Sequence, residues 1–66
     1  MLTLKLNNQA TTTKQTILAD ALKEWGYHEG PYAVAINLTF IPKSKYHTTL
    51  LNHNDHIEIV EPMQGG

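Results

Sequence analysis

The chain of 66 residues has no cysteine and no arginine, and its charges nearly cancel. Without cysteine there can be no disulfide framework, thiolate zinc site, iron–sulfur cluster or cysteine nucleophile. The five basic residues are all lysine and are opposed by six acidic residues, which gives a formal net charge of −1. Nucleic-acid binders normally carry a basic excess and arginines that contact phosphate and guanine. We therefore expect no nucleic-acid partner.

Long hydrophobic runs are also missing. No apolar run approaches the roughly 20 residues that a membrane-spanning helix needs. Residues 1–6 alternate with polar side chains and are too polar for the apolar core of a signal peptide. We therefore expect no membrane association and a cytoplasmic location. A chain of 66 residues is one domain near the lower limit for a hydrophobic core. Few domains of this size can enclose a substrate pocket, so we do not expect an enzyme.

The beginning of the chain alternates as a β-strand does. In residues 2–7 the three leucines fall on one face, and threonine, lysine and asparagine fall on the other. A turn is expected at Asn7 and Asn8, because asparagine tolerates the left-handed conformation of tight hairpins. The threonines of residues 10–13 predict a second strand. Its apolar signal is poor, so we expect it at an edge of the sheet.

A helical period replaces this alternation in residues 16–25, where apolar side chains form a single stripe. We predict the only good helix of the sequence here. The hydroxyl of Thr16, or that of Thr13, is expected to cap its N-terminus. Gly26 is expected to adopt the left-handed conformation that ends the helix. Trp25, the last residue of the stripe, is expected to belong to the core.

The second half of the chain predicts further short strands. Residues 32–38 form a nearly unbroken apolar run, which is typical of a central strand covered on at least one face. Residues 40–41 predict another short strand, which ends at Pro42 because proline cannot donate to a sheet. Residues 43–47 are expected to form an irregular or single-turn link, and residues 48–51 a short extended piece.

The last strand is predicted at residues 56–61, with its two isoleucines on one face. The order is then two strands, one helix and two or three strands, with the first and last strands as natural central neighbours. We therefore expect an α+β fold of the ubiquitin-like β-grasp type, a mixed sheet of four to five strands with one main helix packed on one face. A single domain would span residues 1–66, with 63–66 as a flexible C-terminal tail.

Two glycines, Gly65 and Gly66, end the chain a few residues after the last predicted strand and Pro62. The pair could be a frayed end, but four extended residues reach roughly 13–14 Å, far enough to deliver a carboxylate into another protein's active site. Glycine has no Cβ, so its backbone can pass a narrow channel and approach a nucleotide closely. Attack of the carboxylate on the α-phosphate of ATP would give an acyl-adenylate that a sulfur or nitrogen nucleophile can open. We predict that Gly66 is modified and that both glycines are needed for access.

The histidines offer a weaker candidate site. His53 and His56 flank Asp55 and could be imagined as metal ligands. Two histidines and one acid in a turn lack the supporting shell of a real site. We therefore favour a solvated turn, and we predict no metal site and no catalytic side chain.

One helix can cover only one face of a sheet, which leaves the other face for a partner. Apolar residues late in the sequence could form this surface, and ordinary scattered exposure is an equally good interpretation of them. The candidate surface residues are Phe40, Ile41, Val60 and Met63.

With these features together, the whole chain resembles the ThiS family, the sulfur carriers of thiamine biosynthesis. The residues that carry the resemblance are Thr16-Ile17-Leu18 with Leu22, Ala33-Val34-Ala35-Ile36-Asn37 with Ile41-Pro42-Lys43, residues 51–60, and Gly65-Gly66. Terminal Gly-Gly alone is shared with the molybdopterin-synthase small subunit, ubiquitin-like modifiers and other sulfur carriers, but the combination at this length favours ThiS. Asn54 stands where such chains usually have glycine, and asparagine is the next-best residue for a positive φ.

The resemblance implies a mechanism. A ThiF-like enzyme would adenylate the Gly66 carboxylate with Mg-ATP, and sulfur from a persulfide-bearing protein would displace AMP to give a thiocarboxylate. A ThiG-like thiazole synthase would then take this sulfur. The carrier would bind no cofactor itself. Three alternatives stay open: a sulfur carrier of another pathway (molybdopterin or cysteine type), a ubiquitin-like modifier joined to lysines through Gly66, and a binding-only β-grasp domain.

Overall fold

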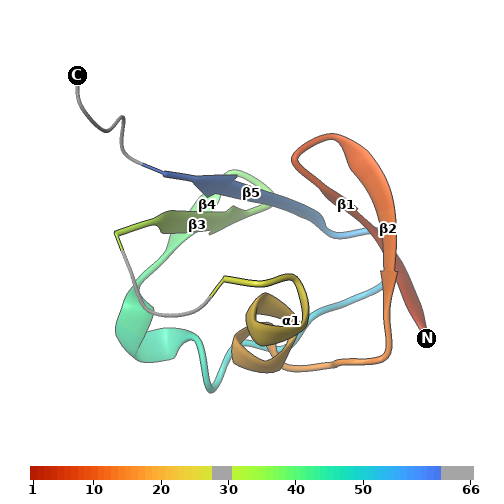
Figure 1. The fold of residues 1–66 in the computed structure, drawn as a ribbon, viewed down its shortest axis with the longest axis horizontal. Coiled ribbons are helices and arrows are strands. Elements are labelled where there is room, and N and C mark those ends of the chain that lie inside the picture. The colour runs from red at the N-terminus through yellow and green to blue at the C-terminus, as the bar shows by residue number, and fades with distance from the viewer. Residues whose placement is uncertain (28–30, 62–66) are drawn as a thin grey trace.

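The computed structural model describes residues 1–27 and 31–61. Within these residues one mixed sheet packs against one α-helix (Figure 1). The elements, in chain order, are β1 (Leu2–Leu6), β2 (Gln9–Thr13), α1 (Leu18–Glu24), β3 (Ala33–Ile36), β4 (Thr39–Ile41), a 3₁₀ helix η1 (Lys43–Lys45) and β5 (His56–Val60). No helix among the described residues is long and apolar enough to cross a membrane.

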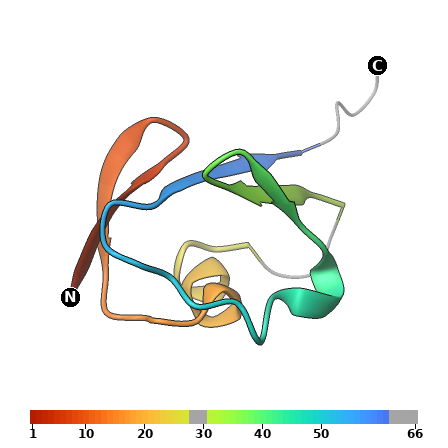
Figure 2. The same ribbon diagram turned by 180° about the vertical axis from the view of Figure 1, so that it is seen from behind.

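The sheet has five strands in the order β2-β1-β5-β3-β4. β1 and β5 are parallel neighbours near its middle, and every other pair is antiparallel. Helix α1 lies under one face, as the two opposite views show (Figures 1 and 2). This confirms the predicted β-grasp, the central pairing of the first and last strands, and the edge position of the threonine-rich strand.

Alternation along the strands decides which side chains enter the core. Leu6 pairs with Ile57, and Ile57 with Ile36, so these side chains point to the same face of neighbouring strands. That face meets the apolar stripe of α1. The buried apolar residues are Leu4, Leu18, Ala19, Ala21, Leu22, Val34, Ile36, Tyr46, Leu51, Ile57 and Ile59. Trp25 is partly buried and packs against this core.

The N-terminus of α1 differs from the prediction. Ile17 is the N-cap residue and no side chain caps the helix, so the expected roles of Thr16 and Thr13 are wrong. The Thr13 hydroxyl instead accepts a hydrogen bond from the Gln15 backbone N–H at 3.0 Å. A side-chain cap is unnecessary here because backbone carbonyls from residues 46–49 accept the bonds of the first helical N–H groups.

The C-terminus of α1 follows the prediction. Gly26 has φ +91°, and its N–H donates to the Lys23 carbonyl at 3.1 Å. The Tyr27 N–H reaches back to the Leu22 carbonyl at 2.8 Å. These two bonds make a Schellman motif, which requires the left-handed residue that glycine supplies at no steric cost.

Two-residue turns close both hairpins. Asn7 and Asn8 have φ values of 50° and 70° between β1 and β2, and Asn37 and Leu38 have φ values of 51° and 70° between β3 and β4. Positive φ at both central residues matches the twist of the flanking strands. The second turn also shortens the strand predicted at 32–38, because the chain reverses at its last two residues.

Other boundaries in the second half also differ. The extended piece predicted at 48–51 contributes one isolated bridge, between Leu50 and Ile17, rather than a strand. Residues 43–45 form the expected single turn. Asn54, in the turn before the last strand, has the predicted positive φ, with a value of 70°.

Candidate functional site

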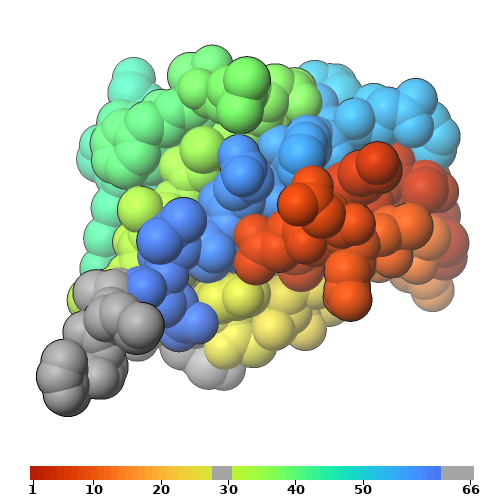
Figure 3. All heavy atoms as spheres, turned by 90° about the horizontal axis from the view of Figure 1, so that it is seen from above, coloured from red at the N-terminus to blue at the C-terminus, as the bar shows by residue number. Residues whose placement is uncertain are grey.

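The face of the sheet opposite α1 is the first candidate surface. Figure 3 looks onto it and shows β5 running between the β3–β4 hairpin and the β1–β2 hairpin. No helix of the described residues covers this face, so the side chains that alternate with the core residues lie in the open. We refer to it below as the open face.

One half of the open face is apolar. Ala35 pairs with Phe40, and Ala33 pairs with Val60, so these four side chains share the face across β4, β3 and β5. The side chains of Phe40 and Val60 are 62% and 65% exposed. The small alanines between them leave a shallow depression of about 140 Å³, which Glu58 also lines. The result is an apolar patch with a carboxylate beside it.

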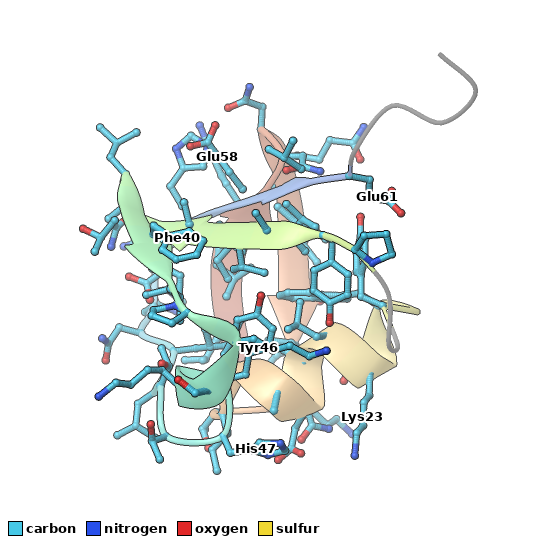
Figure 4. The ribbon with its side chains drawn as sticks, turned by 90° about the vertical axis from the view of Figure 1, so that its left-hand side faces the viewer. Lys23, Phe40, Tyr46, His47, Glu58 and Glu61 are labelled. Atoms are coloured by element: carbon cyan, nitrogen blue, oxygen red, sulfur yellow. The ribbon has the colours of Figure 1, made fainter. Side chains whose placement is uncertain are left out.

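The other half of the open face is polar. Thr3 pairs with Thr12, and Lys5 pairs with His56, so hydroxyl, ammonium and imidazole groups follow β2, β1 and the start of β5. Glu58 pairs with Ala35 and points away from the helix layer (Figure 4). An apolar centre beside polar groups is the usual anatomy of a surface that binds another protein.

The predicted surface residues are only partly brought together. Phe40 and Val60 share the open face, but Ile41 pairs with Val34 on the helix side and packs against the core. The prediction that Ile41 joins this surface is therefore a misassignment of its face, because neighbouring residues of a strand point to opposite sides. Met63 lies outside the described residues.

The predicted terminal residues Gly65 and Gly66 also lie outside the described part of the chain. The last described residue is Glu61, which directly follows β5 (Figure 4). The chain therefore leaves the sheet beside Val60, at the apolar half of the open face.

Asp55 is not the solvated turn residue that the sequence suggested. Its side chain is only 7% exposed. Its Oδ1 accepts a hydrogen bond from the Asn37 side-chain amide, and its Oδ2 accepts one from the Asn52 backbone N–H, both at 2.9 Å. Asn37 in turn accepts a bond from the His56 N–H at 3.0 Å. This carboxylate therefore joins the β3–β4 turn to the start of β5.

The histidines of this turn have separate surroundings. His53 Nδ1 accepts a hydrogen bond from the Thr3 backbone N–H at 3.2 Å, which places the ring proton of a neutral His53 on Nε2. His56 Nε2 is buried without a partner in the described structure. Residues 1–27 and 31–61 contain no group of three or more histidine, aspartate or glutamate side chains arranged to hold a metal ion.

A model of the ThiS family matches residues 4–66 of this sequence. The chain belongs to the ThiS family. The match runs from β1 through β5 to Gly66, so it includes the terminal Gly-Gly as well as the fold. A search of curated proteins gave no match.

A solved structure supports the same fold for this ThiS-family chain. The thiamine biosynthesis protein (ThiS) of Geobacter metallireducens superposes with a TM-score of 0.83. The alignment covers 98% of this chain and 100% of the other, at 17% sequence identity. At this identity the likeness establishes the β-grasp architecture.

Three residues of the ThiS-family open face were missed from the sequence. Ala33, Ala35 and Glu58 line the depression beside Phe40. Period-2 alternation with the buried Val34, Ile36 and Ile57 places all three on the opposite face, and this signal was available. The register that brings Phe40 opposite Ala35 could not be read from the alternation alone.

Proposed function

We propose that this ThiS-family chain is a sulfur carrier of thiamine biosynthesis that works through the carboxylate of Gly66. The observation that carries the proposal is the family match, which extends through β5 to the final glycine. The chain contributes no catalytic side chain and acts as a protein substrate in the cytoplasm. Its part is to present a terminus that partner enzymes can reach.

The chemistry requires two partners in sequence before sulfur is delivered. A ThiF-like enzyme with Mg-ATP adenylates the Gly66 carboxylate and releases pyrophosphate. The terminal sulfur of a protein persulfide then displaces AMP from the acyl-adenylate, and a thiol cleaves the resulting S–S bond to leave the thiocarboxylate. A ThiG-like thiazole synthase accepts this sulfur for the thiazole ring.

The open face supports the recognition step. Burying a large apolar side chain contributes about 1.5–3 kcal/mol, so the exposed fractions of Phe40 and Val60 could each supply about 1–2 kcal/mol to a complex. The chain leaves β5 beside this patch. A partner that covers the apolar half would therefore hold the body of the carrier close to the start of its C-terminal segment.

Intact mass spectrometry tests the proposal. The chain is incubated with a ThiF-like enzyme, Mg-ATP and a persulfide donor, and the expected product has one oxygen exchanged for sulfur. A variant that lacks Gly66 is the control and should gain no sulfur. If the full chain forms neither an adenylate nor a thiocarboxylate with a cognate enzyme, the sulfur-carrier function is wrong. Isopeptide conjugates without thiocarboxylate would identify a protein modifier instead.

A further inference from the structure

A second hollow lies on the helix side of the sheet, away from the open face. It has a volume of about 380 Å³, within the usual size of small-molecule sites. Helix α1, η1 and the approach to β3 border it, and it is half-open to solvent. Its described lining residues are Ala19, Leu22, Lys23, Tyr27, Tyr32, Lys43, Tyr46 and His47. We call this hollow the tyrosine pocket.

Aromatic rings form one wall of the tyrosine pocket. Tyr32 and Tyr46 are stacked with their ring centroids 6.2 Å apart and an interplanar angle of 11°. Tyr27 meets Tyr32 at 5.6 Å with a tilt of 58°. Tyr46 is only 7% exposed, so the partly buried Tyr27 and Tyr32 supply most of the flat apolar surface of this wall. Such a surface, with hydroxyl groups at its edge, suits a planar ring with a polar substituent.

Backbone hydrogen bonds hold this wall in place. The Ala19 N–H donates to the Tyr46 carbonyl at 3.0 Å and so joins α1 to the residue after η1. The Schellman motif at the end of α1 places Tyr27 next to Leu22. These bonds hold the backbone of Tyr27 and Tyr46 in place before a ligand binds.

Among the described residues that line the pocket, the charged side chains have one sign. Lys23 comes from α1 and Lys43 from η1, and no acidic residue is among the described residues that line the hollow. The nearest acid along α1, Glu24, accepts a hydrogen bond from Gln15 at 3.4 Å on another side of the helix. Figure 4 shows Lys23 and His47 at the lower side of the molecule and Tyr46 between the sheet and α1. A local excess of positive charge in a near-neutral protein favours an anion.

The tyrosine hydroxyls do not oppose this preference. Burial raises the pKa of Tyr46, and the proximity of Tyr32 raises it further; burial also raises the pKa of Tyr32. Both side chains therefore stay neutral around pH 7 and can donate hydrogen bonds. A phenolate charge that would repel an anion does not form.

We propose that the tyrosine pocket binds a small planar anion, an aromatic or heteroaromatic phosphate or carboxylate. Its ring lies against the tyrosine wall, and its anionic group lies between Lys23 and Lys43. The site is separate from the open face. Its occupation is independent of whether the chain carries sulfur.

An NMR titration of the isotope-labelled full chain tests this site, with phenyl phosphate as the probe. We expect saturable shifts of the amide signals of Ala19, Lys43 and Tyr46, while Thr12 on the open face does not respond. Benzoate should shift the same signals. Phenol lacks the anionic group and inorganic phosphate lacks the ring, so each should bind at least about ten-fold more weakly than phenyl phosphate.

Lysine variants give the matched control. Lys23→Gln with Lys43→Gln should weaken phenyl phosphate binding about five-fold or more, because two exposed charge contacts are lost. Lys5→Gln removes the same charge from the open face and should change the affinity by less than about two-fold. The spectrum of each variant reports directly whether it is folded. Non-saturable shifts, shifts outside the pocket, or equal loss in both lysine variants would overturn the proposal, as would phenol or phosphate binding as tightly as phenyl phosphate.

Discussion

Replacing Asp55 by alanine should lower the free energy of unfolding by about 2–4 kcal/mol. The carboxylate is almost fully buried and accepts bonds at 2.9 Å from the Asn37 amide and the Asn52 N–H. Truncation leaves two donors without an acceptor, and each such donor costs about 1–3 kcal/mol when it is shielded from water. Both bonds are only part-buried, which favours the lower half of that range for each. A 66-residue chain has a total stability of only about 3–10 kcal/mol.

Urea denaturation followed by fluorescence measures this effect, because Trp25 is the only tryptophan and packs against the core. Asp55→Asn should cost less than Asp55→Ala, about 1–2 kcal/mol, because one oxygen still accepts while the new amide faces a donor. Asp20→Asn is the matched control. Asp20 is exposed in the first turn of α1, so losing its charge there should cost about 0.3–0.5 kcal/mol. If Asp55→Ala costs no more than this control, water satisfies the two donors and the argument from burial is refuted.

Three further predictions follow from other features. Leu38→Gly should raise the unfolding free energy by about 0.5 kcal/mol. The left-handed conformation of an L-residue costs about 1–2 kcal/mol, and the greater flexibility of glycine in the unfolded chain offsets about 0.5–1 kcal/mol of that gain. A urea titration that shows clear destabilisation would contradict this prediction. The pKa of Tyr46 in the folded protein lies above its ordinary value of 10.0, so the protonated side chain stabilises the folded state. This contribution to the unfolding free energy is complete below about pH 10 and is lost as the pH rises through the folded pKa. In Tyr46→Phe the unfolding free energy should therefore fall less steeply between pH 9 and pH 11, roughly the range in which tyrosine titrates. A slope equal to that of the wild type would show that Tyr46 does not cause the decline. Phe40→Ser and Val60→Ser should each lower kcat/KM for adenylation by a ThiF-like enzyme about ten-fold without unfolding the chain. Thr12→Ser on the polar half of the open face is the control and should leave kcat/KM unchanged. Loss of activity in all three variants would argue against a localised docking patch.

Period-2 and helical patterns were sufficient for the architecture. Leucines and isoleucines at every second position identified β1 and β5 as neighbours in the centre of the sheet, and the stripe of α1 identified its buried face. The positive φ of Gly26 and of Asn54 also followed from residue type, because few residues adopt that conformation cheaply. Each of these features follows from residue type and spacing within a short segment.

Individual hydrogen bonds and contacts between distant residues were not predicted. The N-terminus of α1 is satisfied by the carbonyls of Thr49 and Tyr46, so the nearby threonine hydroxyls are not needed. Asp55 is buried because Asn37, in a different turn, reaches its carboxylate. The tyrosine pocket likewise combines side chains from three separate segments, and no local spacing in the sequence indicates it.

The assignment of Ile41 to the partner surface was a different kind of error. Phe40 and Ile41 are adjacent in a short strand, so only one of them can face a given side of the sheet. Alternation alone would have separated them once the strand was accepted.

The central place of β5 makes closure of the sheet depend on a strand late in the sequence. Ile57 and Ile59 fill the middle of the core between β1 and β3, and residue 61 follows the same strand directly. During synthesis the sheet cannot close until this last strand has left the ribosome, since the parallel partner of β1 is missing until then. A chain that ends before residue 56 would lack this strand and could not form the sheet. The open face is complete only when β5 takes its place between β1 and β3, so a chain must be translated through residue 60 before this face exists.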